Sequence, residues 1–352
     1  MNILIVKMSA IGDVIHTLPA LNALRSHFPD AHITWLVEEA AADLVIGHEA
    51  LDRVIVSKRK QLVKQLFSRS FLTGAGKILA FIQELRDTRY DMIIDFQGLL
   101  KSGVMVMLAR GRIKAGFDRG MDHGEQSHIF YNRRIPPVSM EIHALKRGLM
   151  MIEALGIPTE RVEYRLPVSS DDHKTMATLL KEGGIDPEQP LVCINPQATW
   201  ETKLWDNRGF AELSDALQER YGVQVVFTGG PEERDVIDTI MAMTVRPCVS
   251  LAGLTTLKTL AALYRRAELL VTTDTGPMHL GAAVGTRVVA IFGSTAPWRT
   301  GPYGPNHGIV RSNLVCSPCF KRHCPHCHCN CMQGITVEKV MEAVQKQLEP
   351  TL

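Results

Sequence analysis

An aspartate that follows the first apolar run of the chain stands where a general base could act. The run at 3–6 is followed by Lys7-Met8-Ser9-Ala10-Ile11-Gly12-Asp13, and Gly12 permits a tight turn or the close approach of a ligand. Asp13 has two interpretations: an N-cap that accepts backbone N–H bonds, or a base that takes a proton from a bound hydroxyl. N-caps are far commoner than catalytic bases, so these residues alone favour the cap.

Two later loops carry side chains that could bind a phosphate or a ribose. Thr199 and Lys203 follow a predicted strand at 191–195, and both could bind phosphate oxygens, although a loop lysine can also be merely exposed to solvent. Residues 228–233, Thr-Gly-Gly-Pro-Glu-Glu, connect a predicted strand to a helix. A glutamate there could bond ribose hydroxyls, or it could simply favour the first turn of the helix.

A third loop, Thr273-Asp274-Thr275-Gly276-Pro277-Met278-His279, also joins a strand to a helix. Small residues and unpaired N–H groups at a helix start form an anion site. Asp274 is unfavourable beside a phosphate, so we expect it to cap the helix and hold the loop. His279 is by default a structural histidine.

The cysteines are concentrated in one short segment. Six of the eight lie in the pattern Cys316-x-x-Cys319-x4-Cys324-x-x-Cys327-x-Cys329-x-Cys331. Two C-x-x-C pairs with a short spacer can place four thiolates around one tetrahedral ion, with zinc the simple choice and iron the alternative. Reduced cysteines in a surface loop are the other interpretation, and the density of the cluster favours a structural metal site.

A basic segment without acidic residues runs from Arg53 to Gln83. It is either a solvated surface or a surface for an anionic, lipid-bearing partner, whose head groups would meet the charges while apolar side chains enter the interface. Because this charge is concentrated in a nearly neutral chain, we favour the second interpretation. No motif indicates nucleic acid. The cations of the segment are Arg53, Lys58, Arg59, Lys60, Lys64, Arg69 and Lys77.

The elements that must position these residues alternate along the chain. Short apolar runs rich in β-branched residues alternate with helical patterns, which predicts parallel sheets with helices on both faces. Ligands of such sheets bind outside the carboxyl ends of the strands. The predicted strands are 3–6, 33–37, 53–57, 92–95, 191–195, 223–228, 269–272 and 288–292. The predicted helices are 14–28, 99–109, 142–155, 210–221, 234–243, 257–266, 276–284 and 337–348.

Length and composition agree with two such domains. The chain has 352 residues, of which 45% are hydrophobic, and breakers between about 160 and 190 mark a boundary. A net charge of +2 excludes a globally basic nucleic-acid binder. No apolar run reaches the roughly 18 residues of a membrane span, and no secretory signal is predicted. We therefore expect a cytoplasmic protein without a disulfide framework.

Taken in order, five motifs resemble glycosyltransferase family 9, the bacterial ADP-heptose:lipopolysaccharide heptosyltransferases. Together they span nearly the whole chain. The step Val37-Glu38-Glu39 and the run 97–102 are more similar to heptosyltransferase I than to II. The motifs are Lys7 to Asp13, Asp95 to Ser102, the loop of Thr199 and Lys203, Gly229 to Glu233, and Asp274 to His279.

The resemblance implies a GT-B fold, in which two Rossmann-like, doubly wound domains face a cleft. Residues 1–165 would form the acceptor-binding domain. Residues 166–335 would form the nucleotide-sugar domain, including the Cys-rich loop 316–331. Residues 336–352 would form a helix that packs back on the N-terminal domain.

The resemblance also implies an activity: inverting transfer of heptose from ADP-heptose to a Kdo residue of the lipid A inner core, at the inner face of the cytoplasmic membrane. It implies no metal for the chemistry and no nucleic-acid partner. Asp13 matches the proposed base of the family, and this correspondence raises the base above the cap. Lys203 matches the phosphate-binding lysine, which would stabilise the charge of the leaving ADP.

Further site residues are carried over by position, with Glu232 preferred to Glu233 as the ribose contact. The alternatives are heptosyltransferase II, a protein heptosyltransferase, or a non-enzymatic module that binds a nucleotide or a metal. The implied nucleotide-sugar set is Thr199, Lys203, Glu232, Asp274, Thr275, Gly276, Pro277 and His279. The implied acceptor set is Lys58, Arg59, Lys60 and Lys64, and the cysteines that recur in some family members are Cys316, Cys319, Cys324 and Cys331.

Overall fold

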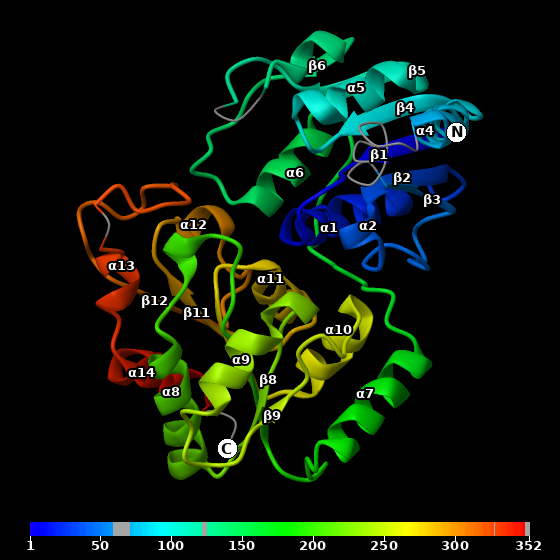
Figure 1. Cartoon of the computed structure of the whole chain (residues 1–352). Helices are drawn as coiled ribbons and strands as arrows, with labels where there is room; N and C mark the ends of the chain where they lie inside the picture. Colours follow the sequence, from blue (N-terminus) through cyan, green and yellow to red (C-terminus); the bar gives the residue numbers. More distant parts are fainter. Residues whose placement is uncertain (59–70, 122–124, 327, 349–352) are drawn as a thin grey trace. The chain divides into compact units, whose positions relative to one another are not determined.

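The computed structural model describes residues 1–58, 71–121, 125–326 and 328–348. The chain divides into two compact units, Met1–Pro167 and Val168–Leu352, here called the N-terminal and C-terminal units. The division lies two residues after the sequence-based boundary at 165. Each unit contains one six-stranded parallel sheet with helices packed on it (Figure 1), so the predicted α/β class with two doubly wound sheets is confirmed.

The sheet of the N-terminal unit has the strand order β3-β2-β1-β4-β5-β6. The order reverses direction between β1 and β4, and open parallel sheets bind ligands at such a switch point. The strands are β1 Asn2–Val6, β2 His32–Glu38, β3 Arg53–Ser57, β4 Arg89–Asp95, β5 Arg110–Phe117 and β6 Arg133–Ile135. The helices are α1 Ile11–His27, α2 Glu39–Ala42, α4 Phe71–Arg86, α5 Leu100–Leu108, η1 Ser127–Phe130 and α6 Ala144–Glu153.

The sheet of the C-terminal unit repeats this order as β12-β11-β10-β7-β8-β9, with its switch point between β7 and β10. The strands are β7 Leu191–Asn195, β8 Gln224–Phe227, β9 Val249–Ser250, β10 Leu269–Thr273, β11 Arg287–Phe292 and β12 His307–Arg311. The longer helices are α7 Ser170–Glu182, α8 Asn207–Tyr221, α9 Arg234–Met241, α10 Leu257–Arg266, α11 Gly276–Ala283 and α14 Val337–Leu348. The short helices are η2 Glu201–Lys203, η3 Pro231–Glu233, α12 Pro297–Thr300 and α13 Asn330–Gln333.

The first strand and helix show how the sequence pattern becomes structure. Residues 3–6 of β1 are fully buried between β2 and β4. Helix α1 begins at Ile11, three residues before the start predicted at 14, because Ala10 is its N-cap. Asp13 is therefore the third residue of the helix, and the interpretation of Asp13 as the N-cap is wrong.

Helix α7 occupies much of the segment that the sequence analysis treated as a boundary. Ser169 is its N-cap and Asp172 reaches back to it, so each of the two side chains accepts the other's backbone N–H, at 3.2 Å and 2.8 Å. A capping box of this kind is a helix-start signal. The Ser and Asp residues there begin an element of the C-terminal unit rather than a linker.

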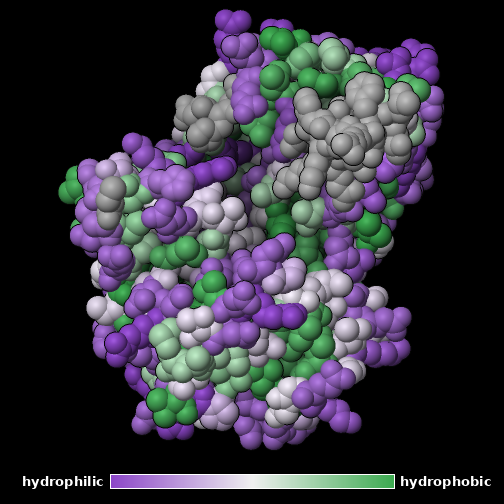
Figure 2. Space-filling model, viewed as in Figure 1, coloured by the Kyte–Doolittle hydropathy of each residue, from purple (hydrophilic) through white to green (hydrophobic). Residues whose placement is uncertain are grey.

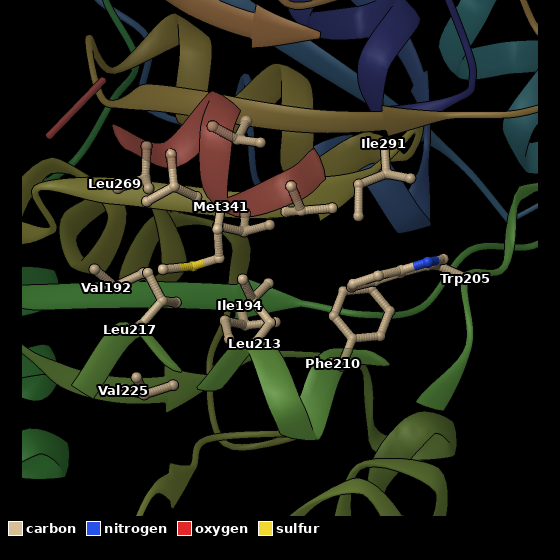
Figure 3. Packing of buried hydrophobic residues seen from close by; sticks show 14 of the residues in the cluster. Val192, Ile194, Trp205, Phe210, Leu213, Leu217, Val225, Leu269, Ile291 and Met341 are labelled. Carbon is tan, nitrogen blue, oxygen red and sulfur yellow. The ribbon is translucent and has the colours of Figure 1, made fainter. Parts of the chain in front are cut away.

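The last helix packs on the core of the C-terminal unit. The expectation that 336–352 returns to the N-terminal domain stays a prediction. Helix α14 contacts α8, β11 and β12. Its buried residues Val340, Met341, Val344 and Leu348 belong to the core of that unit, and Figure 3 shows Met341 among side chains of β7 and α8. The apolar face of α14 is therefore buried in the core of the C-terminal unit.

Among the described residues, no helix combines the length and the apolar character that crossing a bilayer requires. The face of the molecule in Figure 2 is largely hydrophilic, with apolar residues scattered over it.

Truncating α14 tests its place in the core. Met341→Ala should lower the free energy of unfolding by about 2–5 kcal/mol, because it leaves a cavity among buried residues. The measurement is denaturant unfolding of the whole chain. Glu342→Ala changes the exposed neighbour of Met341 and should stay within about 0.5 kcal/mol of the wild type. Equal effects of the two variants would contradict the assigned packing.

Candidate functional site

In the N-terminal unit, two loops meet at the carboxyl edge of the sheet. The last residue of β1, Val6, pairs with Asp95 at the end of β4. The segments that follow are therefore neighbours, and the Lys7 ammonium donates to the carbonyl oxygen of Phe96 at 3.1 Å. The switch point of this sheet thus carries both a cation and the loop that leads to Asp13.

Asp13 keeps an available carboxylate at this edge. Its Oδ2 accepts the N–H of Ala10 at 3.2 Å and lies 3.8 Å from Nζ of Lys7. The side chain is 44% exposed. Among the described residues Asp13 accepts this one backbone bond, so solvent or a bound hydroxyl can reach its remaining lone pairs.

Lys101 and Gln97, which both follow β4 in the chain, also contact the loop between β1 and α1. The sequence analysis assigned no role to either residue. Lys101 donates to Oγ of Ser9 at 2.7 Å and pairs with Oε1 of Glu38 at 3.3 Å. Gln97 accepts the backbone N–H groups of Met8 and Ser9. The available signal was their place after a strand that pairs with β1.

The predicted acceptor cations are only partly described. Lys58 is exposed at the end of β3 and lies 3.6 Å from Oε1 of Glu39. Arg59, Lys60 and Lys64 lie outside the described residues. The acceptor set therefore stays a prediction.

In the C-terminal unit, Lys203 is held by a buried carboxylate. Its Nζ lies 2.7 Å from Oδ2 of Asp274, which also accepts the hydroxyl of Thr295 at 2.6 Å. The Asp274 side chain is 5% exposed, and that of Lys203 is 16% exposed. The same ammonium stands 4.6 Å from the ring centre of Trp200. Asp274 thus joins the segments that follow β7, β10 and β11.

Helix α11 begins within the loop 273–279 that the sequence analysis selected, but its N-cap is not the residue that was expected. Thr275 is the N-cap and its side chain makes no cap bond, so the expectation that Asp274 caps this helix is wrong. Gly276 and Pro277 are its first residues, and His279 is buried one turn later. Because α11 directly follows β10, its first N–H groups lie at the carboxyl edge of the sheet.

The two candidate ribose contacts, Glu232 and Glu233, differ in whether the carboxylate is already hydrogen-bonded. Oε2 of Glu233 accepts the N–H of Gly230 at 2.7 Å, which commits it to the turn before α9. Glu232 is exposed, and within the described ranges its carboxylate forms no hydrogen bond or ion pair. Thr199 is likewise exposed, in the segment after β7. The structure therefore leaves Glu232 and Thr199 accessible.

The loop of Lys203 is tied to the cysteine segment. The hydroxyl of Thr202 donates to the carbonyl oxygen of Lys321 at 2.6 Å, and Trp205 donates to that of Ile335 at 2.8 Å. On the surface, His323 lies 2.9 Å from Glu201. Residues on both sides of Lys203 thus contact the segment 321–335.

The cysteine segment itself places thiols near one another. The backbone N–H groups of Cys329, His326 and His328 lower the pKa of the Cys324 thiol by donating to its sulfur. Burial, followed by the nearby thiols of Cys319, Cys316 and Cys324, raises the pKa of Cys331. Within the ranges that the structure describes, which leave out Cys327, no three potential ligands are arranged to hold a metal ion.

Comparison with known proteins identifies the family to which the chain belongs. The sequence model "Glycosyltransferase family 9 (heptosyltransferase)" matches residues 78–329. The chain belongs to glycosyltransferase family 9. The resemblance inferred from the five motifs is confirmed, and this family 9 enzyme is a glycosyltransferase.

Named relatives of this family 9 enzyme include several lipopolysaccharide heptosyltransferases. It is 33% identical to lipopolysaccharide heptosyltransferase 1 of Pseudomonas aeruginosa, over 93% of this chain and 88% of the relative. It is 29% identical to lipopolysaccharide heptosyltransferase 3 of Escherichia coli, over 82% of both chains. The solved structure of E. coli heptosyltransferase WaaC with ADP superposes with a TM-score of 0.77 at 27% identity, covering 99% and 100% of the two chains. WaaC was also solved with ADP-2-deoxy-2-fluoro heptose.

Neutralising Asp274 tests the ion pair of the C-terminal unit. Asp274→Asn should lower the free energy of unfolding by about 1.5–3 kcal/mol, since a largely buried ammonium loses its charged partner. Thermal or denaturant unfolding measures the change. Asp238→Asn, at an exposed position of α9, is the matched control. If Asp274→Asn were as mild as this control, the pair would not hold the loop.

Proposed function

We propose that this enzyme transfers heptose from ADP-heptose to a Kdo residue of the lipopolysaccharide inner core, with inversion at the anomeric carbon. The relatives named as lipopolysaccharide heptosyltransferases support the donor and the class of acceptor. The motifs more similar to heptosyltransferase I favour a Kdo acceptor. The observation that carries the mechanism is Asp13, an exposed carboxylate with one backbone hydrogen bond at the switch point of its sheet.

The reaction is a single displacement in which Asp13 is the general base. The carboxylate takes the proton of the acceptor hydroxyl while that oxygen attacks the anomeric carbon of heptose. The new carbon–oxygen bond forms as the bond to the diphosphate oxygen breaks, and ADP leaves with the electron pair. Lys7 stands 3.8 Å from the Asp13 carboxylate.

The C-terminal unit supplies the groups for the departing ADP. Lys203 carries the positive charge that stabilises the diphosphate, and Asp274 fixes its position. Thr199 and the start of α11 at Thr275 and Gly276 would bind phosphate oxygens. Glu232, whose carboxylate is accessible, would accept hydrogen bonds from the ribose hydroxyls. Pro277 and His279 shape the first turn of α11 beside this site.

The acceptor carries lipid A, so we place the reaction at the inner face of the cytoplasmic membrane. The basic segment 53–83 is the surface proposed to meet the anionic acceptor and the lipid head groups. Of the four acceptor lysines and arginines, Lys58 is the one that the structure describes; it is exposed after β3, 3.6 Å from Oε1 of Glu39.

A transfer assay with an Asp13 variant tests this proposal. Wild-type enzyme with ADP-heptose should release ADP with Kdo-lipid A and none with lipid A lacking Kdo. Asp13→Asn should lower kcat by about 10²–10⁴-fold because the base is lost, while calorimetry should give an unchanged Kd for ADP. Asp30→Asn, in an exposed turn of the same unit, is the control.

The acceptor panel separates the alternatives. Release only with an acceptor that already carries heptose would replace this proposal with a heptosyltransferase II, and release only with a polypeptide would replace it with a protein heptosyltransferase. No release with any acceptor would favour a binding module. Retained turnover of Asp13→Asn would remove Asp13 as the base.

For the cysteine segment we propose a structural zinc or iron ion with Cys316, Cys319, Cys324 and Cys331 as its ligands. Because no three of these thiols are arranged around one point in the described structure, binding would draw the loop together. The donor set is that of a tetrahedral thiolate site, and three backbone N–H groups already converge on Cys324. Such hydrogen bonds support thiolate ligands from outside the coordination sphere. The ion would fix the loop and takes no part in the transfer step.

Metal analysis tests the site. Enzyme purified without chelators should contain about one equivalent of zinc or iron, and Cys324→Ser should lose most of it. Cys248→Ser, which removes a thiol outside the segment, should retain the metal. Wild-type enzyme with less than about half an equivalent would refute the site.

A further inference from the structure

The loop between β1 and α1 needs partners for its backbone groups, because residues 7–10 belong to neither element. Strand β2 supplies one side. Glu38 N–H donates to the carbonyl oxygen of Met8 at 2.9 Å, and the indole of Trp35 donates to that of Lys7 at 2.9 Å. Strand β2 also accepts the N–H of Lys7, at the carbonyl oxygen of Leu36 (3.3 Å), and Asp13 accepts that of Ala10. The N–H groups of Met8 and Ser9 require an acceptor from elsewhere.

Gln97 provides that acceptor for two consecutive residues. Its Oε1 lies 3.1 Å from the backbone nitrogen of Met8 and 3.1 Å from that of Ser9. Both partners are donors, so the accepting atom has to be the carbonyl oxygen, and this fixes the orientation of the amide. In the parts of the chain that the structure describes, Nε2 of Gln97 donates to no acceptor. One side chain therefore fixes two peptide units.

Gln97 is itself anchored from beneath by Asp95, which is completely buried. One carboxylate oxygen accepts the N–H groups of Gln97 at 2.8 Å and Gly98 at 3.2 Å, and the other accepts the hydroxyl of Tyr131 at 2.7 Å. Gly98 has a φ of +68°, a conformation that glycine adopts without strain. The turn is thereby held in one shape.

The same turn also controls the surroundings of Asp13. Phe96 accepts a bond from the Lys7 ammonium, which is the cation next to the Asp13 carboxylate. Ala10, the next residue after the pair that Gln97 holds, donates to that carboxylate. A shift of the loop would therefore move both the hydrogen bond and the cation of Asp13.

We propose that Gln97 is a positioning residue for the transfer reaction: it fixes residues 8 and 9 and thereby the Asp13 carboxylate. The inference rests on the proposed function in one respect, that Asp13 is the base. Gln97 acts through the loop rather than on the reacting atoms.

Two variants separate positioning from simple support of the fold. Gln97→Ala removes both bonds and should lower kcat about 10–100-fold, since a misplacement of about 1 Å can cost about 100-fold. The Kd for ADP should not change. Gln97→Glu can still accept both N–H groups but adds a second carboxylate beside the same loop. It should therefore restore the loop and move the acidic limb of the kcat/KM profile to higher pH, since a like charge disfavours ionisation.

Amide exchange provides a readout that needs no substrate. Exchange at Met8 and Ser9 should accelerate in Gln97→Ala and stay near wild type in Gln97→Glu. Gln189→Ala, at an exposed position of the C-terminal unit, should change neither exchange nor kcat.

The outcomes distinguish this inference from the proposed function. Unchanged exchange in Gln97→Ala would overturn it, as would faster exchange with a wild-type kcat, or an unshifted acidic limb in Gln97→Glu. A wild-type enzyme that fails to transfer heptose would count against the proposed function, while the exchange data would still decide whether Gln97 fixes the loop.

Discussion

The structure depends on one constraint of parallel sheets: each strand must be followed by a crossover before the next can pair in the same direction. The carboxyl ends of all strands in a sheet therefore share one edge. The N-terminal unit gathers the segments after β1 and β4 there, and the C-terminal unit gathers those after β7, β8, β10 and β11. Candidate residues that are distant in sequence become neighbours for this reason alone.

The two lysine–aspartate pairs show how burial assigns different roles to the same chemical groups. Asp274 is almost inaccessible, and its 2.7 Å contact with Lys203 commits it to holding that ammonium. Asp13 is 44% exposed and stands 3.8 Å from Lys7, so its lone pairs remain available. In the C-terminal unit the buried carboxylate fixes the position of the lysine, whereas in the N-terminal unit the carboxylate is the more accessible partner of the pair.

Strong apolar periodicity made most of the fold predictable. Strands such as β7 at Leu191–Asn195 and helix α14 at Val337–Leu348 have the bounds that the pattern indicates. Strand β5, Arg-Gly-Arg-Ile-Lys-Ala-Gly-Phe, escaped prediction because its charges and glycines hide the alternation. The candidate side chains could be located through motifs, but their partners could not. These partners depend on contacts between residues that are distant in sequence. Examples are the bond of Asp274 to Lys203 in place of a cap on α11, the bonds of Gln97 to the loop before α1, and the packing of α14 in the core of the C-terminal unit.

The bonds from Thr202 and Trp205 to the segment 321–335 have a mechanical consequence. They flank Lys203 on both sides, so the lysine loop and the cysteine segment cannot change shape independently. A change of shape in the cysteine segment, such as one caused by metal binding or thiol oxidation, would therefore move the loop that carries Lys203, the ammonium proposed for the diphosphate. If Lys203 binds the diphosphate as proposed, a change in the cysteine segment would reach the nucleotide site through these two bonds, without a contact between sulfur and nucleotide.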